Sequence, residues 1–246
     1  MKIFLDTANL ADIEEALKGG FVRGVTTNPS LLAKEPKGNY LEHMKKIVSL
    51  CRKYGKGFSL SAEVFSNDPK EMVEQAKQFV KELRYKNLAI KIPIGYKNEN
   101  NLAVIRELTS RGITVNATAC HTSLQLISAA ASGAKYVSLF YNRVRDGAKE
   151  EQYGKERELL LKYKLLEEND YDPDAILRET RALLSDYPET EIIAGSIRTA
   201  LDIKHAGLNG AHIVTASLKI IKNSFSHFKT DYAVEQFLAD FSAWMK

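Results

Sequence analysis

Residues 88–93 read Leu88-Ala89-Ile90-Lys91-Ile92-Pro93, a short apolar run that contains one lysine and ends at a proline. A run of this kind, closed by a residue without an N–H for the ladder, predicts a buried strand. Burying the ammonium of Lys91 is costly unless it is paired or gives up its proton. A neutral lysine in a dry pocket adds to carbonyl carbon and forms a Schiff base. On this stretch alone, a packed stem with its head in water is the more common arrangement, so the interpretation depends on the rest of the chain.

Length and composition exclude several classes of protein. The chain has 246 residues, a hydrophobic share of 44% and a net charge of +4, which suit a globular protein built as one α/β barrel or as two smaller domains. Acidic residues are interspersed with the basic ones, so we expect no nucleic-acid partner. No apolar run approaches the roughly 18 residues of a membrane span, and a charge comes too early for a signal peptide. We therefore expect no membrane association.

The two cysteines, Cys51 and Cys120, are far apart and stand in no metal or redox spacing. A disulfide framework is not expected from such a pair. Free buried thiols are typical of a reducing compartment, so we expect a cytoplasmic protein.

Hydrophobic periodicity, helix caps and glycine stops divide the chain into alternating strands and helices. The runs expected as strands are 2–5, 21–25, 58–64, 88–92, 113–118, 135–140, 191–194 and 211–214. The segments expected as helices are 10–17, 40–54, 68–84, 98–111, 122–132, 172–187, 199–206, 218–223 and 231–244.

Eight strands that alternate with helices imply parallel pairing and match the count of a (β/α)₈ TIM barrel. We expect one such α/β domain over residues 1–246, with an extra C-terminal helix at about 231–244. A doubly wound open sheet is the competing architecture, but nothing resembles its glycine-rich first turn. The longest irregular interval follows residue 140 and carries a charged insertion at about 147–172. Its leucines allow a solvated helix, and a disordered lid is the alternative.

Polar side chains gather at the expected carboxyl ends of the strands, which is where barrels of this type hold their active sites. These residues are Asp6, Asn28, Glu63, Lys91, Asn116, Thr118, Ser138, Ser196 and Arg198. Asp6 and Asn28 taken singly are also frequent helix caps. The common position of the whole set at one end of the barrel favours a reaction site.

The residue types suit chemistry through an iminium ion on Lys91. Such an ion accepts the electrons of a neighbouring C–C bond as that bond breaks, and the retro-aldol step needs a base at the C4 hydroxyl. A single carboxylate such as Asp6 is sufficient for that proton. Glu63, with Thr118 positioning a water molecule, suits the dehydration of the carbinolamine.

The remaining polar residues suit the binding of a phosphorylated ketose. Hydroxyl groups would be held by Asn28, Asn116 and Ser138. A terminal phosphate would be bound by the forked guanidinium groups of Arg143 and Arg198, with the hydroxyl of Ser196.

Seven motifs follow one another in an order known from one family. They are Asp6-Thr7-Ala8-Asn9, Gly24-Val25-Thr26-Thr27-Asn28-Pro29-Ser30-Leu31, Ser61-Ala62-Glu63-Val64, Ile90-Lys91-Ile92-Pro93, Gly112-Ile113-Thr114-Val115-Asn116-Ala117-Thr118, Tyr136-Val137-Ser138-Leu139-Phe140 with Arg143, and Ala194-Gly195-Ser196-Ile197-Arg198. Over nearly its whole length the chain resembles the transaldolase family, in particular the short branch that also holds the fructose-6-phosphate aldolases.

The resemblance implies a class I aldolase-type barrel that uses no metal and no other cofactor, with sugar phosphates as its small-molecule partners. It implies Lys91 as the Schiff-base residue and a proton-transfer group formed by Asp6, Glu63 and Thr118. It also implies a phosphate site formed by Arg143, Ser196 and Arg198. Family members often form pentamers or decamers in which the C-terminal helix reaches a neighbour. We expect such a homo-oligomer here, although the aromatic residues at 231–244 would also suit a helix that covers its own barrel.

Two positions distinguish the branches. Glu63 and Phe140 stand where the aldolase branch typically has glutamine and tyrosine. Phe140 is also an expected substrate contact. Both residues resemble the transaldolase pattern. This favours transfer of a dihydroxyacetone unit from fructose 6-phosphate or a similar ketose phosphate to an aldose phosphate, as in the pentose phosphate pathway. The alternatives are an aldolase or transferase of the same family acting on fructose 6-phosphate or an atypical ketose, and a barrel that binds sugar phosphates without catalysis.

Four segments depart from the family pattern. Ala119-Cys120-His121-Thr122 replaces an aliphatic and aromatic pattern, and His121 is either a new substrate contact or acid–base group, or a cap for the helix that begins at 122. Residues 94–98 replace a Thr-x-Glu-Gly pattern, and Tyr141-Asn142 stands where Val-Gly is common. The 147–172 insertion is longer than the short branch needs. All four changes lie on the substrate face or can reach it, so they bear on which acceptor is used and on whether the substrate carries a phosphate.

Overall fold

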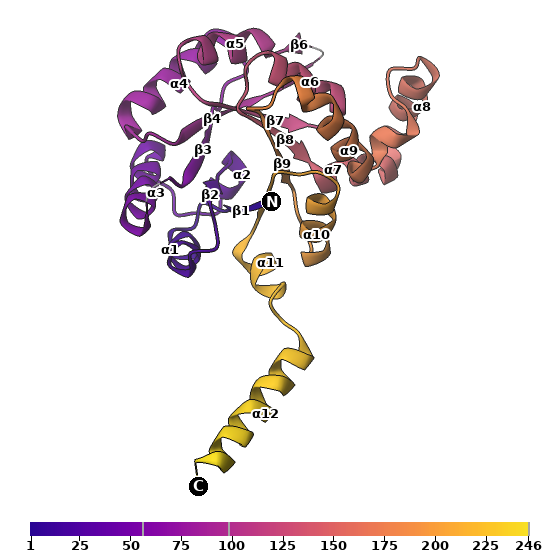
Figure 1. Ribbon diagram of the computed structural model, residues 1–246. Coiled ribbons are helices and arrows are strands. Elements are labelled where there is room, and N and C mark those ends of the chain that lie inside the picture. Colours follow the sequence, from indigo (N-terminus) through magenta and orange to yellow (C-terminus); the bar gives the residue numbers. More distant parts are fainter. Residues whose placement is uncertain (56, 98, 246) are drawn as a thin grey trace.

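The computed structural model describes residues 1–55, 57–97 and 99–245. In this part of the chain a closed parallel barrel is formed by strands in the order β1-β10-β9-β8-β7-β4-β3-β2, with helices around it (Figure 1). The strands are β1 (Lys2–Asp6), β2 (Gly24–Thr26), β3 (Ser59–Glu63), β4 (Leu88–Pro93), β7 (Val115–Cys120), β8 (Tyr136–Phe140), β9 (Glu191–Gly195) and β10 (Ile213–Ala216). The expected (β/α)₈ barrel is confirmed.

The helices follow the amphipathic segments of the sequence. They are α1 (Leu10–Gly19), α2 (Pro29–Leu32), α3 (Tyr40–Tyr54), α4 (Pro69–Leu83), α5 (Leu102–Ser110), α6 (Ser123–Ala131), α7 (Tyr141–Lys149), α8 (Gly154–Lys162), α9 (Pro173–Leu183), α10 (Ala200–Leu208), α11 (Leu218–Asn223) and α12 (Phe228–Trp244), with short 3₁₀ turns η1 (Glu151–Tyr153), η2 (Glu168–Tyr171) and η3 (Leu184–Asp186). Side-chain caps start several of them: Asp68, for example, accepts a hydrogen bond of 2.9 Å from Glu71 N ahead of Pro69.

Strand alternation separates two cores. Outward-facing residues such as Leu5, Leu60 and Ile90 pack against the helices in the main apolar cluster. Inward-facing Phe4, Ile193 and Ile213 form a second cluster with Tyr136. The ring of Phe4 fills the space at Gly24, where a Cβ would lie 2.8 Å from ring atoms. Phe4, Ile213 and Tyr136 each stand two positions before a polar residue of the same strand, namely Asp6, Thr215 and Ser138, so polar side chains collect at the carboxyl end.

A small hairpin follows the lysine strand where a helix from residue 98 is expected. Strands β5 (Gly95–Tyr96) and β6 (Glu99–Asn100) pair antiparallel, and α5 begins only at Leu102. The expected start of the helix, Asn98, lies outside the described residues. The close approach of the two hairpin strands explains the difference, because a Cβ at Gly95 would lie 2.3 Å from the carbonyl oxygen of Glu99.

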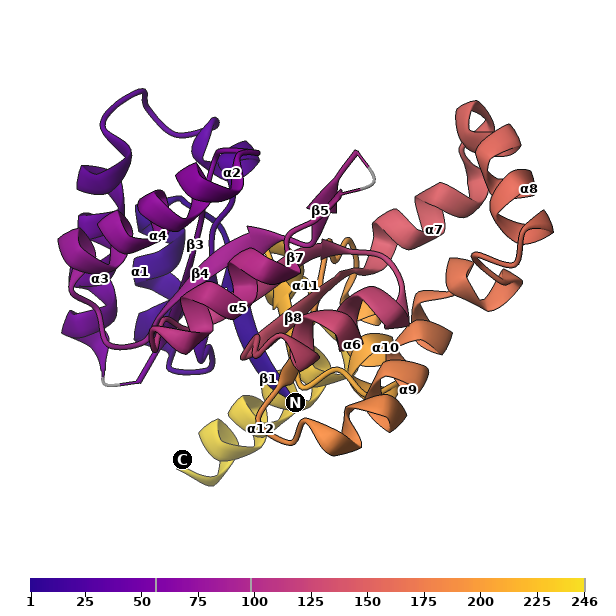
Figure 2. The ribbon, with the colours of Figure 1, turned by 90° about the horizontal axis from the view of Figure 1, so that it is seen from above.

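The expected irregular interval after residue 140 is wrong, because α7 begins directly at Tyr141. Tyr141 is fully buried, donates to Asp174 Oδ1 at 2.5 Å and accepts from Arg145 Nη2 at 2.9 Å. Residues 147–172 hold the end of α7, then η1, α8 and η2, so the solvated-helix alternative is the one observed. Figure 2 shows α7 and α8 reaching outward from the barrel.

Helix α12 leaves the barrel and projects from it (Figure 1). None of its described residues is buried, and Phe237, Phe241 and Trp244 are 68%, 59% and 78% exposed. The alternative in which this helix covers its own barrel is therefore wrong. Within the described chain, no helix combines the length and the apolar character needed to cross a membrane.

Candidate active site

Lys91 and Glu63 form a buried ion pair across two neighbouring strands. The register of β3 against β4 sets the two residues opposite each other. Lys91 is only 5% exposed, and its Nζ lies 2.7 Å from Glu63 Oε2 and donates to the Thr27 carbonyl oxygen at 3.0 Å. Lys91 is buried and the side chain of Glu63 is only 16% exposed, so this proximity compensates a desolvation penalty rather than simply adding stability. It also gives the amine a carboxylate that can accept its proton.

Asp6 ends β1 and accepts a hydrogen bond from a hydroxyl group of β2, which is itself bonded to a hydroxyl group of β10. Thr26 Oγ1 donates to Asp6 Oδ1 at 2.6 Å and shares a 2.6 Å hydrogen bond with Thr215 Oγ1. Burial raises the pKa of Asp6 above its ordinary value, although the Thr26 hydrogen bond and the ammonium of Lys91 act in the opposite direction. A carboxyl group with a raised pKa exchanges its proton more readily near neutral pH. Helix α1 is capped by Asn9 instead, so the alternative of Asp6 as a helix cap is wrong.

The side-chain amide of Asn116, on the strand next to that of Lys91, is held in a fixed orientation by two hydrogen bonds. Asn116 Nδ2 donates to Ser61 Oγ at 3.2 Å, and Asn116 Oδ1 accepts from Ser138 Oγ at 2.6 Å. The hydroxyl of Thr118 is buried and has no hydrogen-bond partner among the described residues. A buried hydroxyl of this kind is available to a bound molecule or a water.

These side chains surround a cavity of about 190 Å³ at the carboxyl end of the barrel, which we call the reaction cavity. Of the eleven residues expected from the sequence, it is lined by Asp6, Asn28, Lys91, Asn116, Thr118, Ser138, Phe140, Arg143 and Ser196, whereas Glu63 reaches it through its contact with Lys91. Asn28 also caps α2 by accepting from Leu31 N at 3.0 Å, so its two interpretations are compatible.

Two polar residues of the cavity were missed from the sequence, namely Thr26 and Thr215. Both are inward-facing hydroxyls in strands β2 and β10, and strand alternation is the signal that points to them. Thr26 in addition directly precedes Thr27-Asn28 within a motif already singled out.

The two arginines expected at a phosphate occupy different surroundings. Arg143, on α7, lines the reaction cavity with its guanidinium over the Phe140 ring at 5.2 Å. Arg198 does not line the cavity. Its side chain is 53% exposed and forms a two-pronged ion pair with Asp146, in which Nη1 lies 2.8 Å from Oδ1.

A polar network fixes the loop between β9 and α10. Asp202 Oδ2 accepts from Asn142 Nδ2 at 2.9 Å and from the backbone N–H groups of Arg198 and Thr199 at 3.0 and 2.9 Å. Asn142 also donates to the Ser196 carbonyl oxygen at 2.9 Å. Burial acts to raise the pKa of Asp202, but these hydrogen bonds outweigh it and the net pKa is lowered. The network holds Ser196 in a left-handed conformation, with φ of 58°.

His121 lies next to the reaction cavity rather than in it. Its Nδ1 is 3.0 Å from the Ala119 carbonyl oxygen, and its ring meets the edge of Phe140 at 5.8 Å. Burial lowers the pKa of His121, which favours the neutral imidazole. Helix α6 is capped by the Thr122 hydroxyl, which accepts from Gln125 N at 3.2 Å. The interpretation of the imidazole as that cap is therefore wrong.

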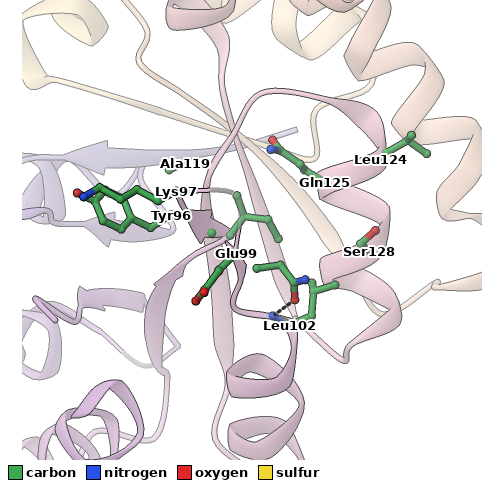
Figure 3. A pocket seen from close by; sticks show the side chains of 11 residues that line it. Tyr96, Lys97, Glu99, Leu102, Ala119, Leu124, Gln125 and Ser128 are labelled. Atoms are coloured by element: carbon green, nitrogen blue, oxygen red, sulfur yellow. Dashed lines mark hydrogen bonds between the residues drawn. The ribbon is translucent and has the colours of Figure 1, made fainter. Parts of the chain in front are cut away.

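A larger hollow of about 540 Å³ lies between the β5–β6 hairpin and α6. Figure 3 shows Tyr96, Lys97 and Glu99 on the hairpin side and Leu124, Gln125 and Ser128 along α6. The described residues that line it form no buried ion pair like that of Lys91 and Glu63. Among the described residues, no group of three or more histidine, cysteine, aspartate or glutamate side chains is arranged to hold a metal ion.

The chain matches known proteins over almost its full length. The family model described as transaldolase/fructose-6-phosphate aldolase matches residues 3–245. A probable transaldolase of Parvibaculum lavamentivorans is 34% identical over 248 residues, covering 100% of this chain and 97% of that protein. One from Geobacillus sp. is 35% identical, covering 98% and 99%, and one from Dehalococcoides mccartyi is 32% identical, covering 100% of both. Together with the barrel and its buried lysine, this extent of similarity means that the chain belongs to the transaldolase/fructose-6-phosphate aldolase family.

Proposed function

We propose that this protein is a transaldolase that moves a dihydroxyacetone unit from fructose 6-phosphate or a similar ketose phosphate to an aldose phosphate, through a Schiff base on Lys91. One observation carries the proposal: the amine of Lys91 is buried at the reaction cavity, 2.7 Å from Glu63. A barrel that only binds sugar phosphates has no need to bury an amine beside a proton acceptor, so this geometry favours catalysis over binding alone.

The reaction begins when Glu63 takes the ammonium proton and the free amine of Lys91 adds to the C2 carbonyl of the ketose. Loss of water from the carbinolamine gives the iminium ion. Asp6 then removes the proton of the C4 hydroxyl, the C3–C4 bond breaks, and its electron pair moves to the iminium to give an enamine. The aldose phosphate leaves. The enamine carbon attacks the acceptor aldehyde, whose oxygen takes the proton back from Asp6, and water releases the new ketose.

The other residues of the cavity bind and orient. The unpartnered hydroxyl of Thr118 positions the water that enters and leaves the carbinolamine, together with Glu63. Asn28, Asn116 and Ser138 hold the hydroxyl groups of the ketose. The phosphate lies against Arg143 and Ser196, since a guanidinium group matches phosphate oxygens in its planar fork.

The position of Arg198 favours a second candidate. Because this guanidinium is paired with Asp146 and does not line the cavity, the guanidinium group that lines the cavity is that of Arg143. One guanidinium group fewer at the cavity suits a ketose with less negative charge, so the second candidate is an aldolase or transferase of the same family that acts on an atypical ketose. Donor consumption measured with and without an acceptor separates the two candidates. Aldehyde release without an acceptor at the full rate of transfer would contradict the assignment as a transaldolase.

Borohydride trapping tests the Schiff base directly. The protein is incubated with fructose 6-phosphate, reduced with sodium borohydride, and analysed by intact mass and then by peptide mass. We expect one adduct of dihydroxyacetone size on the peptide that contains Lys91. Lys91→Met should abolish it, whereas Lys97→Met, which removes a lysine from the adjacent hairpin outside the reaction cavity, should leave it unchanged. Trapping at full yield in Lys91→Met would overturn the proposal.

We propose further that the protein is a cytoplasmic homo-oligomer, a pentamer or a decamer. The buried free thiols of Cys51 and Cys120 support the compartment. The projecting helix α12 supports the assembly, because apolar side chains exposed together on one element mark an interaction surface.

A further inference from the structure

A second hollow adjoins the reaction cavity, and we call it the side pocket. Its volume is about 250 Å³, and the residues that line it include His121, Arg143, Gly147, Tyr153, Leu160 and Tyr171. Its outer wall is built from η1, α8 and η2, and therefore from the insertion that the sequence sets apart from the family pattern. The insertion thus encloses space beside the reaction cavity.

The two hollows share Arg143, which lines both. Phe140 lines the reaction cavity, and its ring contacts both Arg143 at 5.2 Å and His121 at 5.8 Å, the latter a residue of the side pocket. These three side chains therefore form the partition between the hollows. A substrate whose far end passes Arg143 enters the side pocket.

The surface of the side pocket is almost entirely apolar. Two of the polar side chains beyond the partition or in it are committed elsewhere or uncharged. Arg157 donates to the carbonyl oxygens of Gly147 and Glu150 at 2.8 and 2.6 Å, and burial lowers the pKa of His121, which favours its uncharged form. A phosphate therefore finds little to bind beyond the partition. Apolar cavities of about 150 Å³ accommodate a benzene ring, so this one has room for a phenyl or short alkyl group.

We propose that the side pocket is a subsite for an alkyl or aryl group at the far end of an aldehyde acceptor. The inference rests on the proposed function, because it extends the acceptor side of the same reaction. The bond formed remains that between the enamine carbon on Lys91 and the aldehyde carbon, and the aldehyde oxygen takes the proton from Asp6. Such aldehydes are accepted in addition to aldose phosphates, since the apolar group binds beyond Arg143.

The test compares two acceptors with fructose 6-phosphate as donor. One is erythrose 4-phosphate, and the other is 3-phenylpropanal, which carries a phenyl group and no phosphate. We expect the wild-type protein to use both. Leu160→Trp fills the side pocket from α8 and should lower kcat/KM for 3-phenylpropanal by about tenfold or more, while the value for erythrose 4-phosphate changes by less than about twofold.

Two further variants make the result specific. Leu159→Trp introduces the same bulk at the neighbouring position of α8. Leu159 is 50% exposed and does not line the side pocket, so this variant should leave kcat/KM unchanged for both acceptors. Gly147→Leu fills the pocket from α7, where a Cβ meets nothing within 4 Å, and should repeat the effect of Leu160→Trp. The inference would be overturned if kcat/KM for 3-phenylpropanal were the same in Leu160→Trp, Gly147→Leu and Leu159→Trp. It would also be overturned if the wild-type protein transferred to erythrose 4-phosphate but not to 3-phenylpropanal.

The inference and the proposed function fail in different ways. Binding of 3-phenylpropan-1-ol, which has no carbonyl group, is measured by calorimetry and does not depend on Lys91. Binding that is lost in Leu160→Trp and Gly147→Leu but kept in Leu159→Trp supports the pocket even if no Schiff base is trapped. Trapping on Lys91 combined with unchanged binding in both filled variants would retain the transaldolase and reject the subsite.

Discussion

Arg198 is held by Asp146 through both of its terminal nitrogens, with Nη1 at 2.8 Å from Oδ1 and Nη2 in contact with Oδ2. Arg198 lies three residues after the end of β9, and Asp146 lies on α7. The hydrogen bonds from Arg198 lower the pKa of Asp146, so its carboxylate stays charged at neutral pH. This carboxylate occupies the guanidinium fork that the sequence assigns to a substrate phosphate.

Removing the competing carboxylate should therefore strengthen phosphate binding. We expect Asp146→Asn to lower KM for fructose 6-phosphate about two- to fivefold with kcat nearly unchanged, because exposed ion pairs contribute about 0.2–1 kcal/mol. Steady-state kinetics at fixed acceptor concentration measure this. Glu151→Gln removes an exposed acidic charge from the same region and serves as the control. An unchanged KM in Asp146→Asn would mean that Arg198 takes no part in phosphate binding.

Asp6 should trade stability for activity. Because burial raises its pKa in the folded protein above the ordinary 3.8, its charge opposes folding at neutral pH. The protonated Asp6 carboxyl group is the form that suits the folded protein. Its contribution to the free energy of unfolding is fully present below the unfolded-state pKa and is lost as the pH rises through the folded-state pKa. Asp6→Asn should thus raise Tm at pH 7 and have little effect near pH 3, while turnover falls about 10²- to 10⁴-fold.

Thermal unfolding at both pH values and steady-state kinetics test this trade. Asp186→Asn alters an exposed aspartate and should change neither Tm nor turnover. Schiff-base trapping should survive in Asp6→Asn, because the amine and Glu63 are intact. A lower Tm at pH 7 in this variant would contradict the argument.

Asp202 should be a stability determinant of the β9–α10 loop. Asp202→Ala removes a carboxylate that also lies 3.0 Å from Arg145 Nη1 and leaves several donors without a partner, so we expect a loss of about 3 kcal/mol at pH 7. The lowered pKa of Asp202 means that this stability is present above its unfolded-state pKa and lost as the pH falls. Near pH 3, urea unfolding should accordingly show a smaller difference in the free energy of unfolding between Asp202→Ala and the wild-type protein. A difference independent of pH would contradict the role of the charge.

The apolar surface of α12 should control assembly. Replacing Phe237 and Phe241 by serine together should reduce the mass of the particle several-fold in sedimentation velocity, because both rings are more than half exposed in one chain. Serine at Glu235 and Asp240 on the same helix is the matched control and should leave the mass unchanged. An oligomer that survives the phenylalanine replacements would place its interface elsewhere.

The barrel and most of the site are predictable because both follow from local patterns. Short apolar runs, caps and glycine stops gave all of the barrel strands, and strand alternation put Asp6, Lys91 and Asn116 on the inner face. Within the barrel, β7 is predicted at 113–118 and observed at Val115–Cys120, and β2 and β10 also begin two or three residues later than predicted. An irregular register between Ala117 and Cys120, with Ala119 at φ 59°, lies near the end of β7, and periodicity does not reveal such a bulge.

The errors elsewhere arise from contacts between distant segments. Helix α7 is stabilised by the contact of Tyr141 with Asp174, which stands 33 residues away. The position of Arg198 depends on Asp146, which is 52 residues away. The hairpin after Pro93 depends on how closely Gly95 approaches Glu99. No window of neighbouring residues contains such information.

The pairing of β1 with β10 has a consequence for biosynthesis. Lys2 to Leu5 lie beside Ile213 to Ala216, and Thr26 reaches Thr215 across the closed sheet. Asp6 thus leaves the ribosome long before the strand that completes its surroundings. Contacts between such distant segments form slowly and late, so a nascent chain holds its lysine strand well before it can hold an ordered acid–base group. Competence for proton transfer is acquired only when the last barrel strand docks, and the appearance of activity during refolding should therefore report ring closure.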